Sequence, residues 1–261
     1  MGILNVTPDS FSDGGKCFDS RTAVEHALEL VGQGAEILDI GGESTRPGAT
    51  PVDEKEELRR VIPVIEKLAS KIKIPLSIDT MKPAVASTAL RAGASIINDV
   101  AANRNDGEMW KIVSKFRAGY ICMHAPSTFH KLQRQKNIVR EVGIFFQERL
   151  KKLKAAGISP EQVIFDPGIG FGKTLGQNLQ LLAGLRSFTK LKRPLLLGVS
   201  RKSFIEKLTG AKVNERLPAS LACASLAIAD GVQIIRAHDV AETVQVVRMA
   251  EAIAAVVCDR Q

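Results

Sequence analysis

Eight short apolar runs recur along the chain, and an amphipathic stretch of helical periodicity follows each of them. Most of the runs are continuously apolar, which is typical of parallel strands buried on both faces of a sheet. The predicted strands are Ile3–Val6, Glu36–Ile40, Ile74–Asp79, Ser95–Asp99, Gly119–Met123, Val163–Asp166, Pro194–Val199 and Val232–Arg236. The predicted helices cover approximately residues 20–33, 53–70, 82–92, 106–117, 137–156, 177–188, 216–229 and 240–257.

Eight strand–helix units in 261 residues predict an α/β protein with a TIM (β/α)8 barrel. A doubly wound open sheet is the main alternative, but eight repeats favour closure of the sheet. No linker or shift in composition divides the chain, so we expect one domain over residues 1–261. In such a barrel the active site lies at the C-terminal ends of the strands.

Composition excludes several classes of protein. The chain is 45% hydrophobic and 25% charged, which is typical of a globular protein. The four cysteines (Cys17, Cys122, Cys223 and Cys258) form no C-x-x-C pair or zinc-ligand spacing, so we expect reduced thiols in a cytoplasmic protein. The N-terminus does not resemble a signal peptide, and no apolar stretch approaches the roughly 18–20 residues of a membrane span.

The net charge of +8 is concentrated in one segment. Residues 131–154 contain eight lysines and arginines against two glutamates. Such a cluster suits either a nucleic-acid patch or a solvated helix face, and the solvated face is the favoured interpretation. Only one Trp and one Tyr are present, so stacking platforms for single-stranded nucleic acid are scarce. We expect no nucleic-acid partner.

Polar side chains gather where the predicted strands end. These positions converge on one mouth in a (β/α)8 barrel, so the joint pattern carries more weight than any single residue. The polar strand ends are Asn5, Gly41–Gly48, Asp79-Thr80, Asn98-Asp99, Met123-His124, Asp166-Pro167-Gly168, Ser200-Arg201-Lys202-Ser203, Arg236 and His238.

Asp79, Asn98 and Asp166 would place acceptors and an amide deep in this mouth. A carboxylate that faces adjacent ring N–H and amino groups makes two parallel hydrogen bonds. This arrangement suits a heterocycle with a guanidine-like edge, such as a pterin or guanine. The alternative for each aspartate is a helix cap or an Asx-turn, and for Asp99 the two interpretations are equally open.

Cations from different loops would face the same cavity. Arg46, Lys202, Arg236 and His238 suit a phosphate or carboxylate, and an arginine can also stack on a flat ring. The segment Ser200–Ser203 opens a predicted helix, where free N–H groups favour an anion. Surface ion pairs are the alternative explanation for Lys202 and Arg236.

The segment Gly168–Thr174 resembles a Walker A loop, but Pro167 stands where that motif requires a glycine. A glycine-rich turn that lets the backbone approach a flat ligand is the favoured interpretation. The histidines are His26, His124, His130 and His238, and no Ser-His-Asp set is apparent. We therefore expect no histidine-based acyl transfer.

These motifs resemble the dihydropteroate synthase family along essentially the whole chain. The resemblance is carried by Asn5–Gly15, Gly41–Gly48, Asp166–Lys173, Ser200–Ser203 and Arg236–Val240. It implies an enzyme of folate biosynthesis that joins 7,8-dihydropterin-6-ylmethyl diphosphate to 4-aminobenzoate, giving 7,8-dihydropteroate and pyrophosphate.

The resemblance also implies a role for each site residue. Asp79, Lys202 and Arg236 are the predicted catalytic residues. The pterin and its diphosphate would contact Asp79, Asn98, Asp166, Lys202, Arg46, Arg236 and His238. The 4-aminobenzoate pocket would comprise Thr45, Pro47, Phe171 and Ser200. Asn5 would be a ligand of the Mg²⁺ cofactor on the diphosphate.

Several further properties follow from the resemblance. The first two loops would order over the substrates, sulfonamides would compete with 4-aminobenzoate, and the chain would form a homodimer through its C-terminal helices. The fifth loop, Met123–Gln133, departs from the family pattern, and the segment that usually precedes the first strand is missing. Neither departure removes a residue assigned above.

Two other functions remain possible at this stage. A corrinoid-type pterin methyltransferase also uses a barrel with Asp and Asn at its mouth, but it would not need the Thr45–Gly48 loop or the Ser200–Ser203 turn. A paralogue that binds pterin without catalysis would find its support in the altered fifth loop alone. Pterin binding without turnover would identify the second of these.

Overall fold

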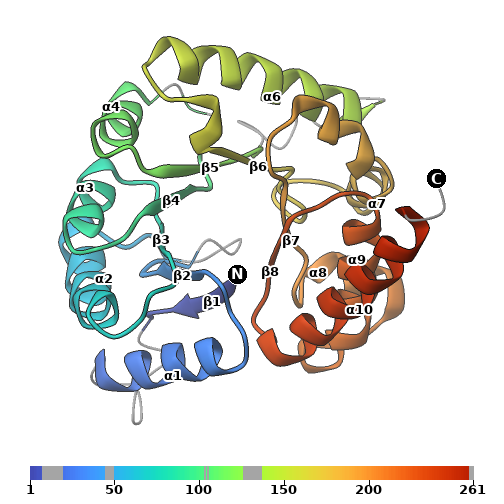
Figure 1. Cartoon of the computed structure of the whole chain (residues 1–261), viewed down its shortest axis with the longest axis horizontal. Helices are drawn as coiled ribbons and strands as arrows, with labels where there is room; N and C mark the ends of the chain where they lie inside the picture. Colours follow the sequence, from blue (N-terminus) through green and yellow to red (C-terminus); the bar gives the residue numbers. More distant parts are fainter. Residues whose placement is uncertain (8–19, 45–49, 103, 105, 126–136, 259–261) are drawn as a thin grey trace.

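The chain folds into a ring of parallel strands surrounded by helices (Figure 1). The computed structural model describes residues 1–7, 20–44, 50–102, 104, 106–125 and 137–258. In these residues a six-stranded parallel sheet runs in the order β1 to β6, and β7 pairs with β8. The strands are β1 Gly2–Asn5, β2 Leu38–Gly41, β3 Leu76–Asp79, β4 Ile96–Asp99, β5 Gly119–Met123, β6 Val163–Asp166, β7 Leu196–Gly198 and β8 Ile234–Arg236.

Two short seams join these sheets into a closed barrel. One isolated bridge pairs Gly2 with Ala237, and the other pairs Phe165 with Leu195. The Ile3 amide donates to the Ala237 carbonyl at 3.0 Å, and the Phe165 amide donates to the Pro194 carbonyl at 2.9 Å. The predicted TIM barrel is therefore confirmed, with its eight strands in sequence order.

An outer ring of helices covers the barrel (Figure 1). Local signals set several of the helix starts: the Asp53 side chain accepts from the Glu56 amide at 2.8 Å, and the Asn137 side chain accepts from the Arg140 amide at 3.0 Å. The helices are α1 Ser20–Gly32, α2 Glu54–Ala69, α3 Pro83–Arg91, α4 Gly107–Phe116, α6 Ile138–Ala155, α7 Leu175–Ala183, α8 Ser203–Thr209, α9 Leu217–Ala229 and α10 Val240–Cys258.

The second half of the barrel differs in detail from the sequence prediction. The helix expected over 177–188 stops at Ala183, and the chain continues as the 3₁₀ helix η2, Leu185–Leu191. Gly184 separates the two, because glycine is a poor helix former and a Cβ at this position would lie 2.7 Å from Val139. The short helix α8 begins at Ser203, so the helix expected to open at Ser200–Ser203 is present, although it is not one of the eight helices of the predicted strand–helix units.

The hydrophobic core lies between the strands and their helices. Phe146 of α6 stacks on Phe165 of β6 with ring centroids 4.3 Å apart, and its edge meets Phe188 of η2 at 5.4 Å. These side chains are almost fully buried and fix the helices against the sheet. Of the helices in the described part of the chain, none is long and apolar enough to cross a membrane.

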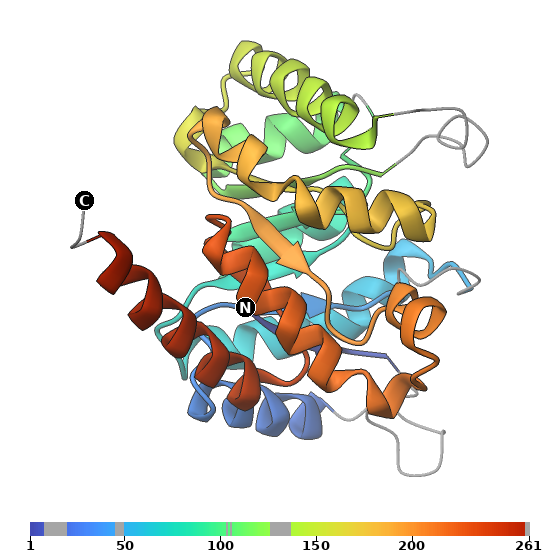
Figure 2. The ribbon, with the colours of Figure 1, turned by 90° about the vertical axis from the view of Figure 1, so that its right-hand side faces the viewer.

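On the outside of the barrel, α9 and α10 pack side by side near the C-terminus (Figure 2). Large apolar side chains of these helices face away from the core. Leu226 of α9 is 71% exposed, and Met249 and Ile253 of α10 are 64% and 60% exposed. This apolar face is uncovered in the single chain.

Candidate active site

The floor of the barrel mouth is lined by acidic and amide side chains from adjacent strands. Parallel pairing brings Gly41, Asp79 and Asn98 level with one another, and it brings Met123 level with Asp166. Asp79, Asn98 and Asp166 are all buried. The sequence prediction that these three side chains lie at the ends of strands is confirmed by the structure.

Arg236 of β8 crosses this floor and pairs with two aspartates. Its Nε donates to Asp39 Oδ2 at 2.6 Å, and its Nη2 donates to Asp79 Oδ2 at 2.9 Å. Asn98 Nδ2 also donates to Asp39 Oδ2, at 2.9 Å. Burial raises the pKa of Asp79 to about 7, although the neighbouring Arg236 charge opposes the shift. The four residues therefore form one hydrogen-bonded network.

Sequence reasoning missed Asp39, which is fully buried in β2. The signal was available, because Asp39 is the only charged residue in the apolar run from Ile37 to Ile40. A carboxylate in a buried strand is costly unless it is paired. An isolated acid inside an apolar strand therefore predicts a cation in contact with it, and here the cation is Arg236.

Some acceptors on the floor have no hydrogen-bond partner among the described residues. They are Oδ1 of Asp39, Asp79 and Asn98. Buried acceptors are nearly always satisfied in proteins, since leaving one unpaired costs about 1–3 kcal/mol. The floor can thus accept several hydrogen bonds from a ligand that carries adjacent N–H groups.

Asp99, beside Asn98, has a different role. Its Oδ1 accepts from the Ala101 amide at 2.9 Å, which is an Asx-turn, and its Oδ2 accepts from the Tyr120 hydroxyl at 2.7 Å. Both carboxylate oxygens are therefore used inside the protein. Of the two interpretations left open by the sequence, the structural one holds for Asp99.

Lys202 and Asp166 form the opposite wall of the mouth. Lys202 precedes the first residue of α8, and its ammonium donates to the Ile169 carbonyl and lies 4.6 Å from the centroid of the Phe171 ring. Burial lowers the pKa of Lys202 to about 8; the nearby Asp166 opposes this shift, whereas Arg236 adds to it. The structure thus brings Asp166, Lys202 and Phe171 together.

The glycine-rich segment after β6 is a tight turn rather than a phosphate loop. Gly168 has a φ of +68°, and a Cβ there would lie 2.1 Å from the His124 carbonyl oxygen. The Lys173 ammonium is buried and donates to the carbonyls of His124 at 3.0 Å and Gly168 at 2.7 Å. A lysine engaged in this way holds the turn together, in agreement with the interpretation drawn from Pro167.

The third group of site residues lies between β8 and β1. The Ser200 hydroxyl is 3.0 Å from Nδ1 of His238 and accepts from the His238 amide at 3.2 Å. His238 and Asn5 line the same groove, which has a volume of about 560 Å³. The remaining lining residues of the groove are Ile3, Thr22, Glu25, His26 and Glu29.

Part of the predicted site falls outside the described residues. Thr45, Arg46 and Pro47 belong to this part, as does most of the divergent fifth loop at residues 126–136. Among the described residues, the structure places Asp79, Asn98 and Arg236 in one network, and it places Ser200 beside His238.

A barrel whose mouth combines buried acceptors with cations defines a class of ligand-binding enzymes, and comparison with protein families identifies that class. The family model described as "Pterin binding enzyme" matches residues 1–238. The chain therefore belongs to the pterin-binding enzymes that fold as a TIM barrel.

Individual relatives narrow this class. Dihydropteroate synthase of Escherichia coli is 45% identical over 255 residues, which cover 97% of this chain and 90% of the relative. A structure of the Xanthomonas albilineans dihydropteroate synthase with 4-aminobenzoic acid is 46% identical, with a TM-score of 0.90 over 97% of this chain and 91% of that chain. The Yersinia pestis dihydropteroate synthase with a sulfonamide drug is 42% identical, with a TM-score of 0.90 over 97% and 93%. The chain belongs to the dihydropteroate synthase family, and the predicted enzymatic activity is confirmed.

Proposed function

We propose that the described site residues divide the synthase reaction among three subsites. As a member of this family, the enzyme joins 7,8-dihydropterin-6-ylmethyl diphosphate to 4-aminobenzoate and releases 7,8-dihydropteroate and pyrophosphate. The observation that carries the assignment is the set of buried acceptors with no partner among the described residues, next to buried or half-buried cations.

The pterin ring binds on the acidic floor. Asp79 Oδ1 and Asn98 Oδ1 accept from the ring N–H and amino groups, which restores the hydrogen bonds that these buried atoms otherwise lack. Asp166 accepts from the other side of the ring, and its Oδ1 is oriented by the Gly168 amide at 2.7 Å. Lys202 donates to an acceptor at the edge of the ring. The floor therefore discriminates in favour of a heterocycle with a guanidine-like edge.

The diphosphate lies toward the groove of Asn5 and His238. Arg236 and Arg46 supply positive charge and N–H donors to its oxygens, and His238 contributes a ring nitrogen to the same subsite. The Asn5 side-chain oxygen fits Mg²⁺, which prefers oxygen ligands and usually binds proteins through few side chains together with substrate phosphates and water. When bound, Mg²⁺ would neutralise charge on the diphosphate; Asn5 would hold it.

The third subsite receives 4-aminobenzoate beside the turn after β6. The Phe171 ring supplies a flat apolar surface, and Lys202 lies over that ring. Thr45, Pro47 and Ser200 complete the pocket. A sulfonamide resembles 4-aminobenzoate in shape and charge, so it competes for this surface.

The reaction forms one C–N bond and breaks one C–O bond. The amine nitrogen of 4-aminobenzoate attacks the methylene carbon of the pterin, the C–O electron pair leaves with pyrophosphate, and the amine loses a proton to solvent. Asp79 and Asp166 stabilise positive charge on the pterin in the transition state, while Arg236 and Lys202 stabilise the leaving group. An aromatic amine is already nucleophilic, so no strong general base is required.

A second copy of the chain covers the apolar face of α9 and α10. Leu226, Met249, Ile253 and Val256 are each more than half exposed, which is unusual for large apolar side chains on one surface. We infer a homodimer from this face.

The thiols of Cys122 and Cys223 are free, which supports a reducing compartment such as the cytoplasm.

Pyrophosphate release tests the proposed function directly. We expect Mg²⁺-dependent release from the pterin diphosphate only when 4-aminobenzoate is present, and suppression by a sulfonamide. Asp230→Asn is the matched control, because Asp230 pairs with Arg186 on the surface, away from the site. Tight pterin binding without pyrophosphate release would contradict the assigned roles and would indicate a non-catalytic binder.

A further inference from the structure

The turn between β7 and α8 contains a residue in a conformation that is costly for its side chain. Arg201 has a φ of +55°. The other non-glycine residues with positive φ in the described chain, Arg117 and Lys192, end helices, where this conformation is common. Arg201 ends no helix, so its backbone is held by the surrounding structure.

Three residues, two at or in α9 and one just before α10, hold Arg201 in place. Its amide donates to the Ser220 hydroxyl of α9 at 3.0 Å, and its carbonyl accepts from Nη1 of Arg216 at 2.9 Å. Its guanidinium forks onto Asp239, with Nε 2.9 Å from Oδ2 and Nη2 in contact with Oδ1. A bidentate fork is the strongest geometry available to such a pair.

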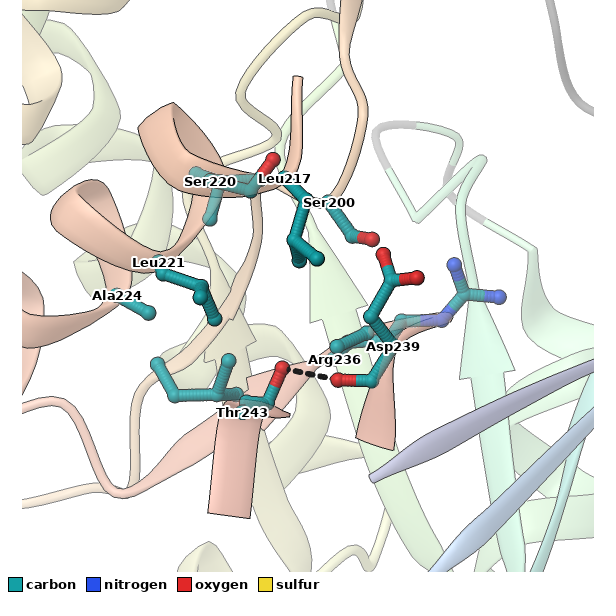
Figure 3. Close-up of a pocket in the computed structure, with 11 residues that line it drawn as sticks. Ser200, Leu217, Ser220, Leu221, Ala224, Arg236, Asp239 and Thr243 are labelled. Atoms are coloured by element: carbon teal, nitrogen blue, oxygen red, sulfur yellow. Dashed lines mark hydrogen bonds between the residues drawn. The ribbon is translucent and has the colours of Figure 1, made fainter. Parts of the chain in front are cut away.

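Asp239 is itself fixed from the other side. Its carbonyl accepts from the Thr243 hydroxyl of α10 at 2.6 Å, as Figure 3 shows. In the same view Ser200 lies near Asp239, with Ser220 and Leu217 of α9 on the other side of a small cavity. The fork therefore connects the loop after β7 to the start of α10.

The residues on either side of Arg201 belong to two different subsites. In an extended chain Ser200 and Lys202 would point to the same face, because side chains alternate with a period of two. Here Ser200 turns to His238, on the β8 side, whereas Lys202 turns to Ile169 and Phe171, on the β6 side. The left-handed conformation of Arg201 separates the two directions.

The contacts of residues 200 and 201 also run in parallel. Ser200 bonds His238, and Arg201 bonds the next residue, Asp239. A hydroxyl can form more than one hydrogen bond, so the Ser200 side chain contacts both the backbone amide and the ring of His238 and fixes the place of that ring.

We propose that Arg201 and Asp239 are positioning residues for the diphosphate and pterin subsites. The fork sets the place of His238 through Ser200 and Asp239, and the left-handed backbone of Arg201 sets the direction of Lys202. This proposal rests on the function assigned above to His238 and Lys202. Neither Arg201 nor Asp239 needs to contact the substrate.

Two pterin probes separate the two effects. One is the pterin diphosphate, and the other is 6-hydroxymethylpterin, which lacks the diphosphate; binding of both is measured by calorimetry at a fixed, saturating Mg²⁺ concentration. In Asp239→Asn we expect the affinity for the diphosphate probe to fall about tenfold or more, as for loss of a charge-assisted hydrogen bond, while the affinity for 6-hydroxymethylpterin changes less than about twofold.

Arg201→Gly and Arg201→Ala form a matched pair. Both lose the fork, so both lose affinity for the diphosphate probe. Only glycine adopts the left-handed conformation without cost, so Arg201→Gly should bind 6-hydroxymethylpterin about fivefold or more tightly than Arg201→Ala. Asp230→Asn, which breaks a surface pair with Arg186, is the control and should bind both probes as the unmodified chain does.

Clear outcomes would overturn the proposal. Equal loss of affinity for both probes in Asp239→Asn would indicate general damage to the fold, and unchanged affinity for both would indicate a plain surface ion pair. Equal binding of 6-hydroxymethylpterin by the two Arg201 variants would overturn the backbone role. If the unmodified chain itself binds the two probes equally, the diphosphate subsite is wrong, and the proposal fails with it.

Discussion

The two sheets of the barrel contribute opposite charges to the mouth. The acids Asp39, Asp79 and Asp166 belong to strands of the six-stranded sheet. Arg236 belongs to β8 of the two-stranded sheet, and Lys202 lies in the loop after β7 of that sheet. The acids are buried within or at the ends of strands, and the cations reach them from across the seam. In the function proposed above, the six-stranded sheet thus supplies acceptors for the pterin, and the two-stranded sheet supplies charge for the leaving group.

Backbone pairing between the two sheets is sparse, whereas charged side chains form several hydrogen bonds between them. Each edge of the two-stranded sheet is tied to the larger sheet by an isolated bridge. Arg236 bonds Asp39 and Asp79 across one edge, and Lys202 bonds the Ile169 carbonyl across the other. The charges proposed to bind substrate therefore also link the two sheets, so variants of these charges should affect substrate binding and stability to different degrees.

The largest effect is expected for Asp39→Ala, which removes a structural link across the seam. Arg236 loses one carboxylate partner and Asn98 loses its acceptor, so the free energy of unfolding should fall by about 3–5 kcal/mol, as when one partner of a buried ion pair is removed. Urea unfolding measures this loss. Asp230→Ala, which breaks an exposed pair, should change stability by about 0.5 kcal/mol or less. Similar losses in both variants would show that the seam does not depend on Asp39.

Asp166→Asn should separate binding from folding. The amide replaces one acceptor oxygen by a donor, so pterin affinity should fall by about 2–3 kcal/mol, or roughly 30- to 150-fold. The remaining oxygen can still accept from the Gly168 amide, so the fold should stay intact. Calorimetry with 6-hydroxymethylpterin and the near-UV circular dichroism spectrum measure the two properties. Unchanged pterin affinity would refute the role assigned to Asp166.

Lys173→Met tests the turn that carries Phe171. The substitution leaves the His124 and Gly168 carbonyls without their donor, so the turn loosens on the six-stranded side of the seam. We expect the KM for 4-aminobenzoate to rise by the equivalent of about 1–2 kcal/mol, while pterin affinity changes much less. Steady-state kinetics at saturating pterin diphosphate measure the effect. A loss confined to pterin affinity would contradict the placement of the 4-aminobenzoate pocket.

The sequence predicted most of the site residues on the six-stranded sheet, but fewer of the side-chain contacts made by the two-stranded sheet. Strand periodicity places Asp79, Asn98 and Asp166 at strand ends, since parallel strands with short register shifts bring their ends together. Pairings such as Ser200 with His238 depend on side chains 38 positions apart and on the left-handed turn at Arg201. No local pattern encodes that geometry, and an arginine is a residue in which positive φ is rarely expected.

Asp39 shows a different limit of sequence reasoning. It lies inside a strand rather than at its end, so a search for polar strand ends passes over it. Its partner Arg236 is 197 positions away in the sequence, and closure of the barrel brings the two together. A search for lone charges within apolar strands would have found Asp39, although it would not have identified the partner.

The smallest effect is the pH dependence of pterin binding, which compares the two sheets directly. Burial raises the pKa of Asp79 to about 7; Arg236 opposes this shift, and the charges of Asp39, Glu57 and Asp99 add to it. Asp79 is therefore charged only above that pH. Burial lowers the pKa of Lys202 to about 8; Asp166 opposes this shift, and Arg236 adds to it. Lys202 is therefore charged only below that pH.

Affinity for 6-hydroxymethylpterin should therefore be highest between pH 7 and 8. It should fall as the pH drops, because Asp79 gains a proton, and it should fall about threefold between pH 7.5 and 8.5, because Lys202 loses one. This probe carries no diphosphate, so ionisation of a leaving group does not contribute. Asp79→Asn should abolish the acidic limb and keep the alkaline one. An alkaline limb that disappears in Asp79→Asn as well would mean that the two sheets titrate as one coupled group, and the division of charge between them would not hold.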